Sequence, residues 1–271
     1  AKPKLTIITT VDLDHQQFLG ETIPEIAYQK AGIIKQGVPV IVGPQHEAAL
    51  EVIEKEAMRY SAPALVHGQH WHVGEENGRM VYQDENGLLD LPLPNLRGAH
   101  QIGNAGMAIA ALRHLGFDEA ACEGAVTKAF WPARMQRLRS GSLVERAPRA
   151  ELWLDGGHNP AAGKALADTL ADLPKRATHL ICGMLSTKDV VGYLRPLAAQ
   201  AASLHAIAIP GEAATLSAED TADAAREVGF ETHVAASLDD AMADILARDP
   251  EARILICGSL YLAGAVLREN G

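Results

Sequence analysis

Aromatic residues are scarce in this 271-residue chain, where Phe, Trp and Tyr together make up 4%. The hydrophobic fraction is nevertheless 48%, so the core must consist mostly of Ala, Leu, Ile and Val. The charged fraction is 21%, close to the globular average, which argues against a mainly disordered chain. The length suits one large or two ordinary domains.

Cysteine is also rare. The three cysteines, Cys122, Cys182 and Cys257, lie far apart and show no CxxC spacing. This pattern argues against a disulfide scaffold or a zinc knuckle and favours a reducing cytoplasm. The opening residues, AKPKLTIITT, lack the long apolar stretch and cleavage site of a signal peptide. No uncharged apolar segment is long enough to span a bilayer, so no membrane partner is expected.

Basic residues are outnumbered, with 24 Lys+Arg against 34 Asp+Glu and a formal net charge of −10. A nucleic-acid binder would show a basic stripe, so no nucleic-acid partner is expected. A local basic patch can still bind an anionic ligand. The GxxxxGK[ST] phosphate loop and the GxGxxG dinucleotide fingerprint both fail to occur in these residues.

The first half of the chain predicts two kinds of local structure. Short alternating runs between residues 65 and 93 are broken twice by ENG, which indicates hairpin turns. The stretch FWPARMQRLRSG, residues 130–141, contains a proline, several arginines and a closing Ser-Gly, and is predicted to be a linker. The other expected elements are strands at 5–10 and 38–43 and helices at 25–30, 47–60, 102–115 and 118–129.

The second half alternates strands with helices, which predicts βαβ units and a mainly parallel sheet. Such sheets bind ligands at the carboxyl ends of their strands. Three polar stretches lie at predicted strand ends: Asp155 to Asn159, Gly183 to Asp189, and Gly258 with Ser259. The strands are expected at 151–155, 179–183, 204–209, 231–234 and 253–258.

The stretch LDGGHNPAAGKAL joins one of these strands to a helix. Asp155 ends the strand, two glycines allow a tight turn and close approach by a ligand, and Asn159 with Pro160 fits a helix start. The exposed amides of that helix start would favour an anion. The alternative is an ordinary strand–turn–helix in which His158 is a solvated loop residue, and the pattern by itself leaves both open.

Other polar residues have both a structural and a functional interpretation. Asp12, Asp14, His15 and Lys30 follow an apolar strand, as metal or phosphate ligands do. Asn104 lies in an Ala-rich helix that is mostly core, which favours the structural interpretation. Arg134 is either a surface arginine of the linker or a phosphate clamp. The polar residues Ser186, Thr187, Lys188 and Asp189 form either an ordinary loop or a charged ligand edge.

Four stretches in this order resemble the folylpolyglutamate synthase/dihydrofolate synthase family of the Mur ligase superfamily. They are LDHQQFLGETIPEIAYQKAGI, GAHQIGNAGMAIAAL, LDGGHNPAAGKAL with CGMLSTKD after it, and ILICGSLYLAG. The resemblance covers essentially the whole chain. It implies an α/β fold, with the remnant of a P-loop ATPase-type central domain at residues 1–136 and a Rossmann-like C-terminal domain with a mainly parallel sheet at 137–271.

The resemblance also implies an activity. Family members use ATP and Mg²⁺ to phosphorylate a carboxylate of dihydropteroate or folate, and the amine of L-glutamate then attacks the acyl phosphate. Lys30 matches a lysine that many members carry as an N-carboxylated side chain, and it is expected with His158 to be catalytic. The remaining assignments are His15 to magnesium, Asn104 to adenine, Arg134 to the ATP phosphates, Asp155 to the ribose or ATP, and Ser259 to the glutamate side.

The sequence departs from the family pattern in two ways. The usual PGR around Arg134 reads PAR here, and the family's phosphate loop would precede residue 1. We therefore expect the C-terminal portion of a longer ligase, inactive by itself. A remnant sheet exposes strand edges, so the fragment either stays folded through its C-terminal domain or self-associates, whereas the parent is expected to be a monomer.

Two other functions remain open at this point. A muramyl-peptide ligase acting on a UDP-linked acceptor shares the general layout, but the QKAGI and DGGHNP spellings argue against it. A catalytically silent binding module is the alternative from another class.

Overall fold

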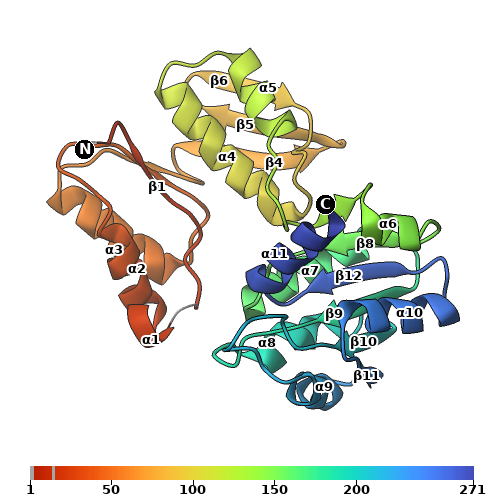
Figure 1. Cartoon of the computed structure of the whole chain (residues 1–271). Helices are drawn as coiled ribbons and strands as arrows, with labels where there is room; N and C mark the ends of the chain where they lie inside the picture. Colours follow the sequence, from red (N-terminus) through yellow and green to blue (C-terminus); the bar gives the residue numbers. More distant parts are fainter. Residues whose placement is uncertain (1–2, 14–15) are drawn as a thin grey trace. The chain divides into compact units, whose positions relative to one another are not determined.

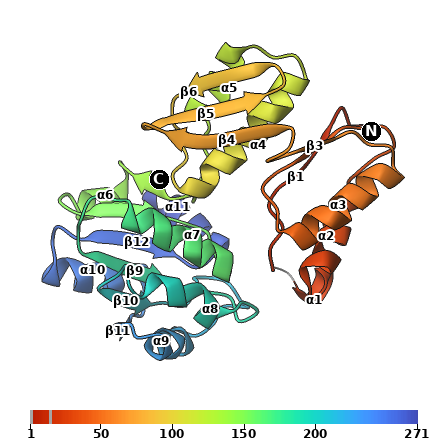
Figure 2. The ribbon, with the colours of Figure 1, turned by 180° about the vertical axis from the view of Figure 1, so that it is seen from behind.

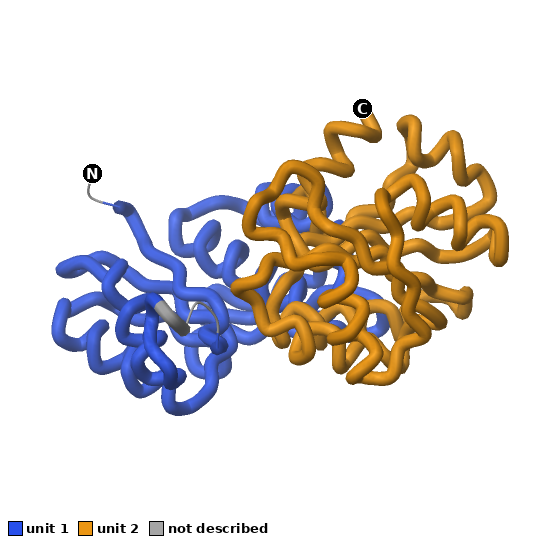
Figure 3. Tube along the Cα trace, turned by 60° about the horizontal axis from the view of Figure 1, so that its bottom comes forward, with its two compact units in different colours: residues 1–130 blue, residues 131–271 orange. Residues whose placement is uncertain are grey.

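The computed structural model describes residues 3–13 and 16–271. The chain divides into two compact units, Ala1–Phe130 and Trp131–Gly271 (Figure 3). Among the described helices, none combines the length and the apolar character needed to cross a membrane.

The first unit begins with a small parallel sheet in the order β1-β2-β3, built from β1 (Thr6–Ile8), β2 (Val40–Val42) and β3 (Ala64–Val66). Helices α2 (Ile23–Ala31) and α3 (Glu47–Arg59) follow β1 and β2, and a short α1 (Gln16–Leu19) precedes them. Ile26 and Ile53 from the two longer helices are fully buried with the apolar side chains of the sheet. A capping box between Thr22 and Glu25 fixes the start of α2.

The rest of the first unit is an antiparallel meander of β4 (Trp71–Glu76), β5 (Arg79–Asp84) and β6 (Gly87–Leu91). Asn77 and Gly78 both have positive φ, 51° and 74°, which suits a two-residue hairpin turn. The predicted hairpins at the two ENG sequences are thereby confirmed. Helices α4 (Ala99–His114) and α5 (Glu119–Thr127) cover one face of the meander (Figure 2).

The second unit is a six-stranded sheet in the order β11-β10-β9-β12-β8-β7, parallel except for β7 (Figure 1). The mainly parallel sheet is as predicted. Helices α7, α8 and α9 bury Leu166, Tyr193 and Ala222 on one face, and α6, α10 and α11 bury Leu143, Met242 and Leu262 on the other. The strands are β7 (Gln136–Leu138), β8 (Glu151–Leu154), β9 (Thr178–Cys182), β10 (Ser203–Ala206), β11 (Thr232–Val234) and β12 (Arg253–Cys257). The helices are α6 (Ser142–Arg146), α7 (Pro160–Ala171), α8 (Val190–Leu194) with the 3₁₀ turn η1 (Arg195–Leu197), α9 (Ala218–Glu227), α10 (Leu238–Arg248) and α11 (Leu260–Asn270).

The predicted linker, residues 130–141, begins where the two units divide, but it contains a strand of the second unit in its middle. Strand β7 lies within it and pairs antiparallel with β8, with Arg137 opposite Trp153. The Arg137 guanidinium lies over the Trp153 ring, 5.4 Å from its centroid. An arginine in a three-residue edge strand resembles a loop residue in sequence, because the packing of Arg137 on Trp153 is visible only in the fold.

Glu151 connects three neighbouring strands of the second sheet. Its carboxylate accepts a hydrogen bond from Arg253 on β12 at 3.1 Å and pairs with Arg137 on β7 at 3.0 Å. Burial acts to raise the pKa of Glu151, but the hydrogen bonds from Arg137, Trp153 and Arg253 outweigh it and lower the pKa to about 2. The Arg253 side chain is only 3% exposed, so its buried positive charge needs the Glu151 carboxylate to compensate for it.

We expect Glu151→Gln to alter the acid sensitivity of the second unit. The folded-state pKa lies below the unfolded value of 4.5, so the carboxylate stabilises the fold above that pH, and this stabilisation is lost as the pH falls toward 2. The loss should be about 2 kcal/mol after allowance for solvent screening. Urea unfolding at pH 7, 4.5 and 3 measures it. The variant should be less stable at pH 7 and show a shallower decline with acid, whereas Glu251→Gln, at an exposed carboxylate, should follow the wild type.

Gly163 allows α7 to approach α8 closely, because a Cβ at this position would overlap the carbonyl oxygen of Tyr193. Gly163→Ala should therefore destabilise the second unit by about 3 kcal/mol. Gly124 in α5 is the matched control, since a Cβ there would meet no atom within 4 Å. Gly124→Ala should stabilise the first unit by about 0.8 kcal/mol through helix propensity. Equal effects of the two substitutions in urea unfolding would refute the packing argument.

Candidate functional site

Three loops meet at the carboxyl edge of the second sheet, because β9, β12 and β8 are neighbours in the strand order (Figure 1). Each predicted stretch follows one of these parallel strands: Gly183 to Asp189 after β9, Gly258 with Ser259 after β12, and Asp155 to Asn159 after β8. The fold thus gathers Asp155, His158 and Ser259 along one edge. This is the edge at which parallel sheets bind ligands.

Asp155 is the buried charge of this edge, with 5% of its surface exposed. One carboxylate oxygen accepts the N–H of Gly157 at 2.7 Å, and the other accepts the N–H of Met135 at 2.8 Å. Burial raises the pKa of Asp155, and the two N–H donors and the nearby Arg134 charge oppose that rise. The carboxylate thus ties the turn that precedes β7 to the turn that follows β8.

Arg134 lies at the tip of that first turn and is exposed. Its neighbours Ala133 and Met135 both have left-handed backbones, with φ of 56° and 40°. Such conformations cost non-glycine residues about 1 kcal/mol or more each. Hydrogen bonds hold the turn: the Ala133 carbonyl accepts from Gly156 at 2.9 Å, and the Ala133 N–H donates to Gln136 Oε1 at 2.9 Å. The strained turn presents the guanidinium to solvent, where its charge acts to lower the pKa of Asp155.

The turn after Asp155 has the predicted helix start, because Asn159 Oδ1 accepts the N–H of Ala162 at 2.8 Å and Pro160 is the first residue of α7. The two glycines, however, are needed for packing within the protein. A Cβ on Gly156 would overlap the Leu260 side chain, and one on Gly157 would lie 2.9 Å from both Ala162 and Asp155 Oδ1. The glycines therefore serve contacts within the fold, whatever ligand binds there.

His158 is partly buried, and its Nδ1 lies 3.0 Å from the carbonyl oxygen of Gly156. A carbonyl only accepts, so Nδ1 carries the proton in this contact. In the neutral ring the lone pair is then on Nε2. The geometry thus fixes the tautomer of a histidine at the edge of the sheet and leaves Nε2 as the basic atom.

The other polar residues of this edge cap helices. Ser259 is 3% exposed, and its Oγ accepts the N–H of Tyr261 at the start of α11 at 3.1 Å. Asp189 Oδ1 accepts the N–H of Gly192 in α8 at 2.8 Å. Gly258 turns the chain with φ of 104°, where a Cβ would lie 2.8 Å from the carbonyl oxygen of Gly183. Both caps fix where a helix begins relative to the sheet.

The first unit carries the remaining candidates. Asn104 is exposed on α4, and its amide donates to Gln101 Oε1 at 3.1 Å. Gln101 is 6% exposed and contacts His100 Nε2 at 2.9 Å, so it acts as a buried support for Asn104. Lys30 lies partly buried in the last turn of α2. His15, the predicted metal ligand, lies outside the described residues.

Sequence reasoning missed two supports of the site. The first is the left-handed turn around Arg134, which a glycine would have indicated but which Ala133 conceals. The second is Gln101, for which the only signal was a polar residue three positions before Asn104 on an otherwise Ala-rich helix. Both act through backbone or side-chain geometry that residue identity does not reveal.

Comparison with known proteins gives consistent matches. Residues 133–260 match the family model described as Mur ligase, glutamate ligase domain. Folylpolyglutamate synthase of Lacticaseibacillus casei is 29% identical over 97% of this chain and 61% of its own length. The structure of E. coli FolC in complex with DHPP and ADP matches with a TM-score of 0.84 and 27% identity, covering 98% of this chain and 61% of that one. Mycobacterium tuberculosis folylpolyglutamate synthase complexed with ADP and AMPPCP matches with a TM-score of 0.81 and 30% identity, covering 98% and 63%.

The chain therefore spans about three fifths of the length of these relatives, with coverage of 61–63%. Both units take part in the matches, because 97–98% of the chain is aligned. The family model covers the sheet edge that carries Arg134, Asp155, His158 and Ser259. Residues 133–260, in the second unit, thus match the Mur ligase glutamate ligase domain, and the chain as a whole is similar to folylpolyglutamate and dihydrofolate synthases.

Proposed function

We propose that the chain contributes these residues to an ATP-dependent ligase that joins L-glutamate to dihydropteroate or to a folate through an acyl phosphate. The observation that carries the proposal is the strained turn that exposes the Arg134 guanidinium and is held by the buried Asp155 carboxylate through the Met135 N–H. Relatives of this chain have structures with ADP, AMPPCP and DHPP, which supports a nucleotide and a pterin-type acceptor as ligands.

The described residues fit the phosphates of a nucleotide. An exposed guanidinium offers a planar pair of donors that matches phosphate oxygens, and the hydrogen bond from the Met135 N–H to Asp155 fixes the backbone next to it. Asn104, supported by Gln101, offers the amide that adenine recognition needs. We place Arg134 at the phosphates, Asp155 as its anchor and nucleotide contact, and Asn104 at the adenine. ATP supplies the phosphoryl group that activates the acceptor carboxylate.

The described residues are less suited to binding magnesium than to binding phosphates. Magnesium prefers oxygen ligands, and Lys30 as an ammonium group offers only donors. N-carboxylation of Lys30 would supply two oxygens and reverse its charge, so we propose Lys30 as a metal-orienting group only in that form. His15 remains a proposed metal ligand.

His158 is suited to the glutamate side. The contact of Nδ1 with the Gly156 carbonyl leaves Nε2 as the acceptor in the neutral ring. We propose that Nε2 accepts a proton from the ammonium group of L-glutamate, which frees the amine for attack on the acyl phosphate. Ser259, at the neighbouring strand end, would help orient the same substrate.

Ligation assays in the complete ligase that contains these residues would test this function. We expect ATP-dependent glutamate incorporation with dihydropteroate or tetrahydrofolate and none with a UDP-linked muramyl peptide. Incorporation into the UDP-linked acceptor alone would favour the muramyl alternative. Nucleotide binding without ligation of any acceptor would favour the silent binding module.

The 271-residue chain by itself is proposed to be inactive, because its residues include no phosphate-binding loop of the GxxxxGK[ST] type. The purified chain should release no phosphate from ATP and incorporate no labelled glutamate under conditions in which the complete ligase turns over. Phosphate release or glutamate incorporation above the no-enzyme rate would overturn this proposal.

In the complete ligase, Arg134→Ala should lower kcat about 100-fold, the loss typical of removing one preorganised group that stabilises transition-state charge. Arg139→Ala is the matched control, since Arg139 is also exposed and follows β7. It should leave kcat unchanged. Unfolding curves of both variants should match the wild type, and equal kinetic effects of the two substitutions would contradict the phosphate role of Arg134.

A further inference from the structure

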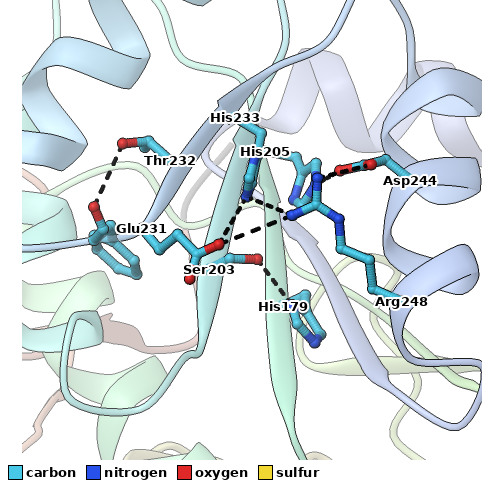
Figure 4. A network of polar contacts seen from close by, with 9 residues as sticks. His179, Ser203, His205, Glu231, Thr232, His233, Asp244 and Arg248 are labelled. Carbon is cyan, nitrogen blue, oxygen red and sulfur yellow. Dashed lines mark hydrogen bonds and ion pairs between the residues drawn. The ribbon is translucent and has the colours of Figure 1, made fainter.

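A second polar cluster lies away from the candidate ligase site, on the face of the sheet that α10 covers (Figure 4). His205 on β10 and His233 on β11 are paired across the two parallel strands, and their rings stack with centroids 4.6 Å apart. Asp244 reaches them from α10, with Oδ2 2.8 Å from His205 Nε2. Strands β9 and β12 separate β10 from β8, so this cluster is distinct from Arg134 and Asp155.

The cluster has the composition and spacing of a metal site. One potential ligand atom from each of His205, His233 and Asp244 lies within 4.8 Å of the other two. Two imidazole nitrogens with a carboxylate oxygen are a donor set that zinc and similar transition-metal ions favour. Calcium and magnesium prefer oxygen donors throughout. Glu231, whose Oε1 lies 3.2 Å from His233 Nε2, offers a fourth donor.

The guanidinium of Arg248 already places a positive charge among the side chains of this cluster. Its guanidinium lies 3.0 Å from Asp244 Oδ1, 3.1 Å from His233 Nε2 and 3.9 Å from Glu231 Oε1. A guanidinium only donates and a carboxylate only accepts. His233 Nε2 can accept a hydrogen bond from Arg248 only when it carries no proton, and it can donate one to Glu231 only when it does. It therefore cannot form both hydrogen bonds at once. A cation that both Nε2 and the carboxylates can approach resolves this conflict.

We propose that His205, His233 and Asp244 bind one divalent transition-metal ion of the zinc class, with Arg248 displaced to solvent and Glu231 as the fourth donor. Arg248 can leave because its side chain is 51% exposed and its partners Asp244 and Glu231 are also largely solvated, at 40% and 67%. Exposed ion pairs of this kind hold their partners weakly. The same exposure gives the ion access from solvent.

Binding requires one proton shift, within His205. Its Nε2–H now donates to Asp244, so the proton must move to Nδ1 before Nε2 can coordinate the ion. Nδ1 is buried and has no hydrogen-bond partner in the described structure. An N–H there is left unsatisfied, so the affinity should be lower than that of a zinc site with a complete second shell of hydrogen bonds.

An ion at this place would join three elements of the second unit. His205 belongs to β10, His233 to the three-residue edge strand β11, and Asp244 to α10. An edge strand of that length has few ladder hydrogen bonds of its own. A ligand that binds only the folded state stabilises it by mass action, so the ion should raise the unfolding temperature.

The test is zinc titration of the chain without a polyhistidine tag, by calorimetry and by competition with a chromogenic chelator. We expect one equivalent of Zn²⁺ per chain, a rise in Tm, and with Co²⁺ a visible absorption band of tetrahedral type. His233→Ala and Asp244→Asn should each weaken binding at least tenfold. Arg248→Ala should tighten it, because removal of the competing cation leaves the carboxylates unneutralised.

Arg226→Ala is the matched control, because Arg226 is also 51% exposed and pairs with Asp223 elsewhere in the second unit. It should bind zinc as the wild type does. The proposal is overturned if no stoichiometric binding occurs, if His233→Ala and Asp244→Asn bind like the wild type, or if Arg248→Ala weakens binding. Circular dichroism checks the fold of each variant, and Arg248→Ala remains decisive if a ligand variant fails to fold.

Discussion

The Asp155 carboxylate accepts hydrogen bonds from two chain segments that meet at one sheet edge, and the candidate ligase site depends on it. Met135 donates from the turn before β7, and Gly157 donates from the turn after β8. The first bond holds Arg134 in a turn with two left-handed residues. The second shapes the loop that carries His158 and leads into α7. A carboxylate is suited to both bonds because each of its oxygens accepts from an N–H.

The same edge shows how helix starts fix the geometry of a site. Asn159, Asp189 and Ser259 each follow a strand and cap the next helix through a side-chain oxygen. Two close backbone contacts fix the geometry further. Gly258 packs against the carbonyl of Gly183, and Gly163 allows α7 to pack against the backbone of α8. The loops therefore have little freedom of their own, and the exposed groups, above all Arg134, project from a rigid support.

Much of this architecture follows from sequence periodicity. The alternation of apolar strands with helices predicts the parallel sheet of the second unit, and ENG at 76–78 predicts the hairpin because Asn and Gly accept positive φ. Strand β7 escapes prediction because Arg137 occupies a strand position by stacking on Trp153 and pairing with Glu151. Those partners are 14 or more positions away in the sequence. Secondary-structure propensities of neighbouring residues cannot predict contacts at this separation.

The site shows the same division between local and long-range causes. The helix cap at Asn159 is local, since it depends on residues within a few positions, and its sequence signature is reliable. The turn at Arg134 depends on Asp155, 20 positions from Met135. Ala133 lacks the conformational freedom of glycine, so the hydrogen bonds around it must maintain its left-handed backbone.

The six-stranded sheet is uneven in polarity, and this separates its two polar regions. On the face covered by α10 and α11, β8 and β12 present Leu152, Leu154, Ile254 and Ile256, whereas β10 and β11 present His205 and His233. Burial of an imidazole such as His205 costs free energy unless a partner compensates for it, and Asp244 is that partner. The carboxyl-edge loops and the histidine cluster are thus built from different strands with different partners. A change at one should leave the other intact, so the residues of the carboxyl edge and those of the histidine cluster can be substituted independently.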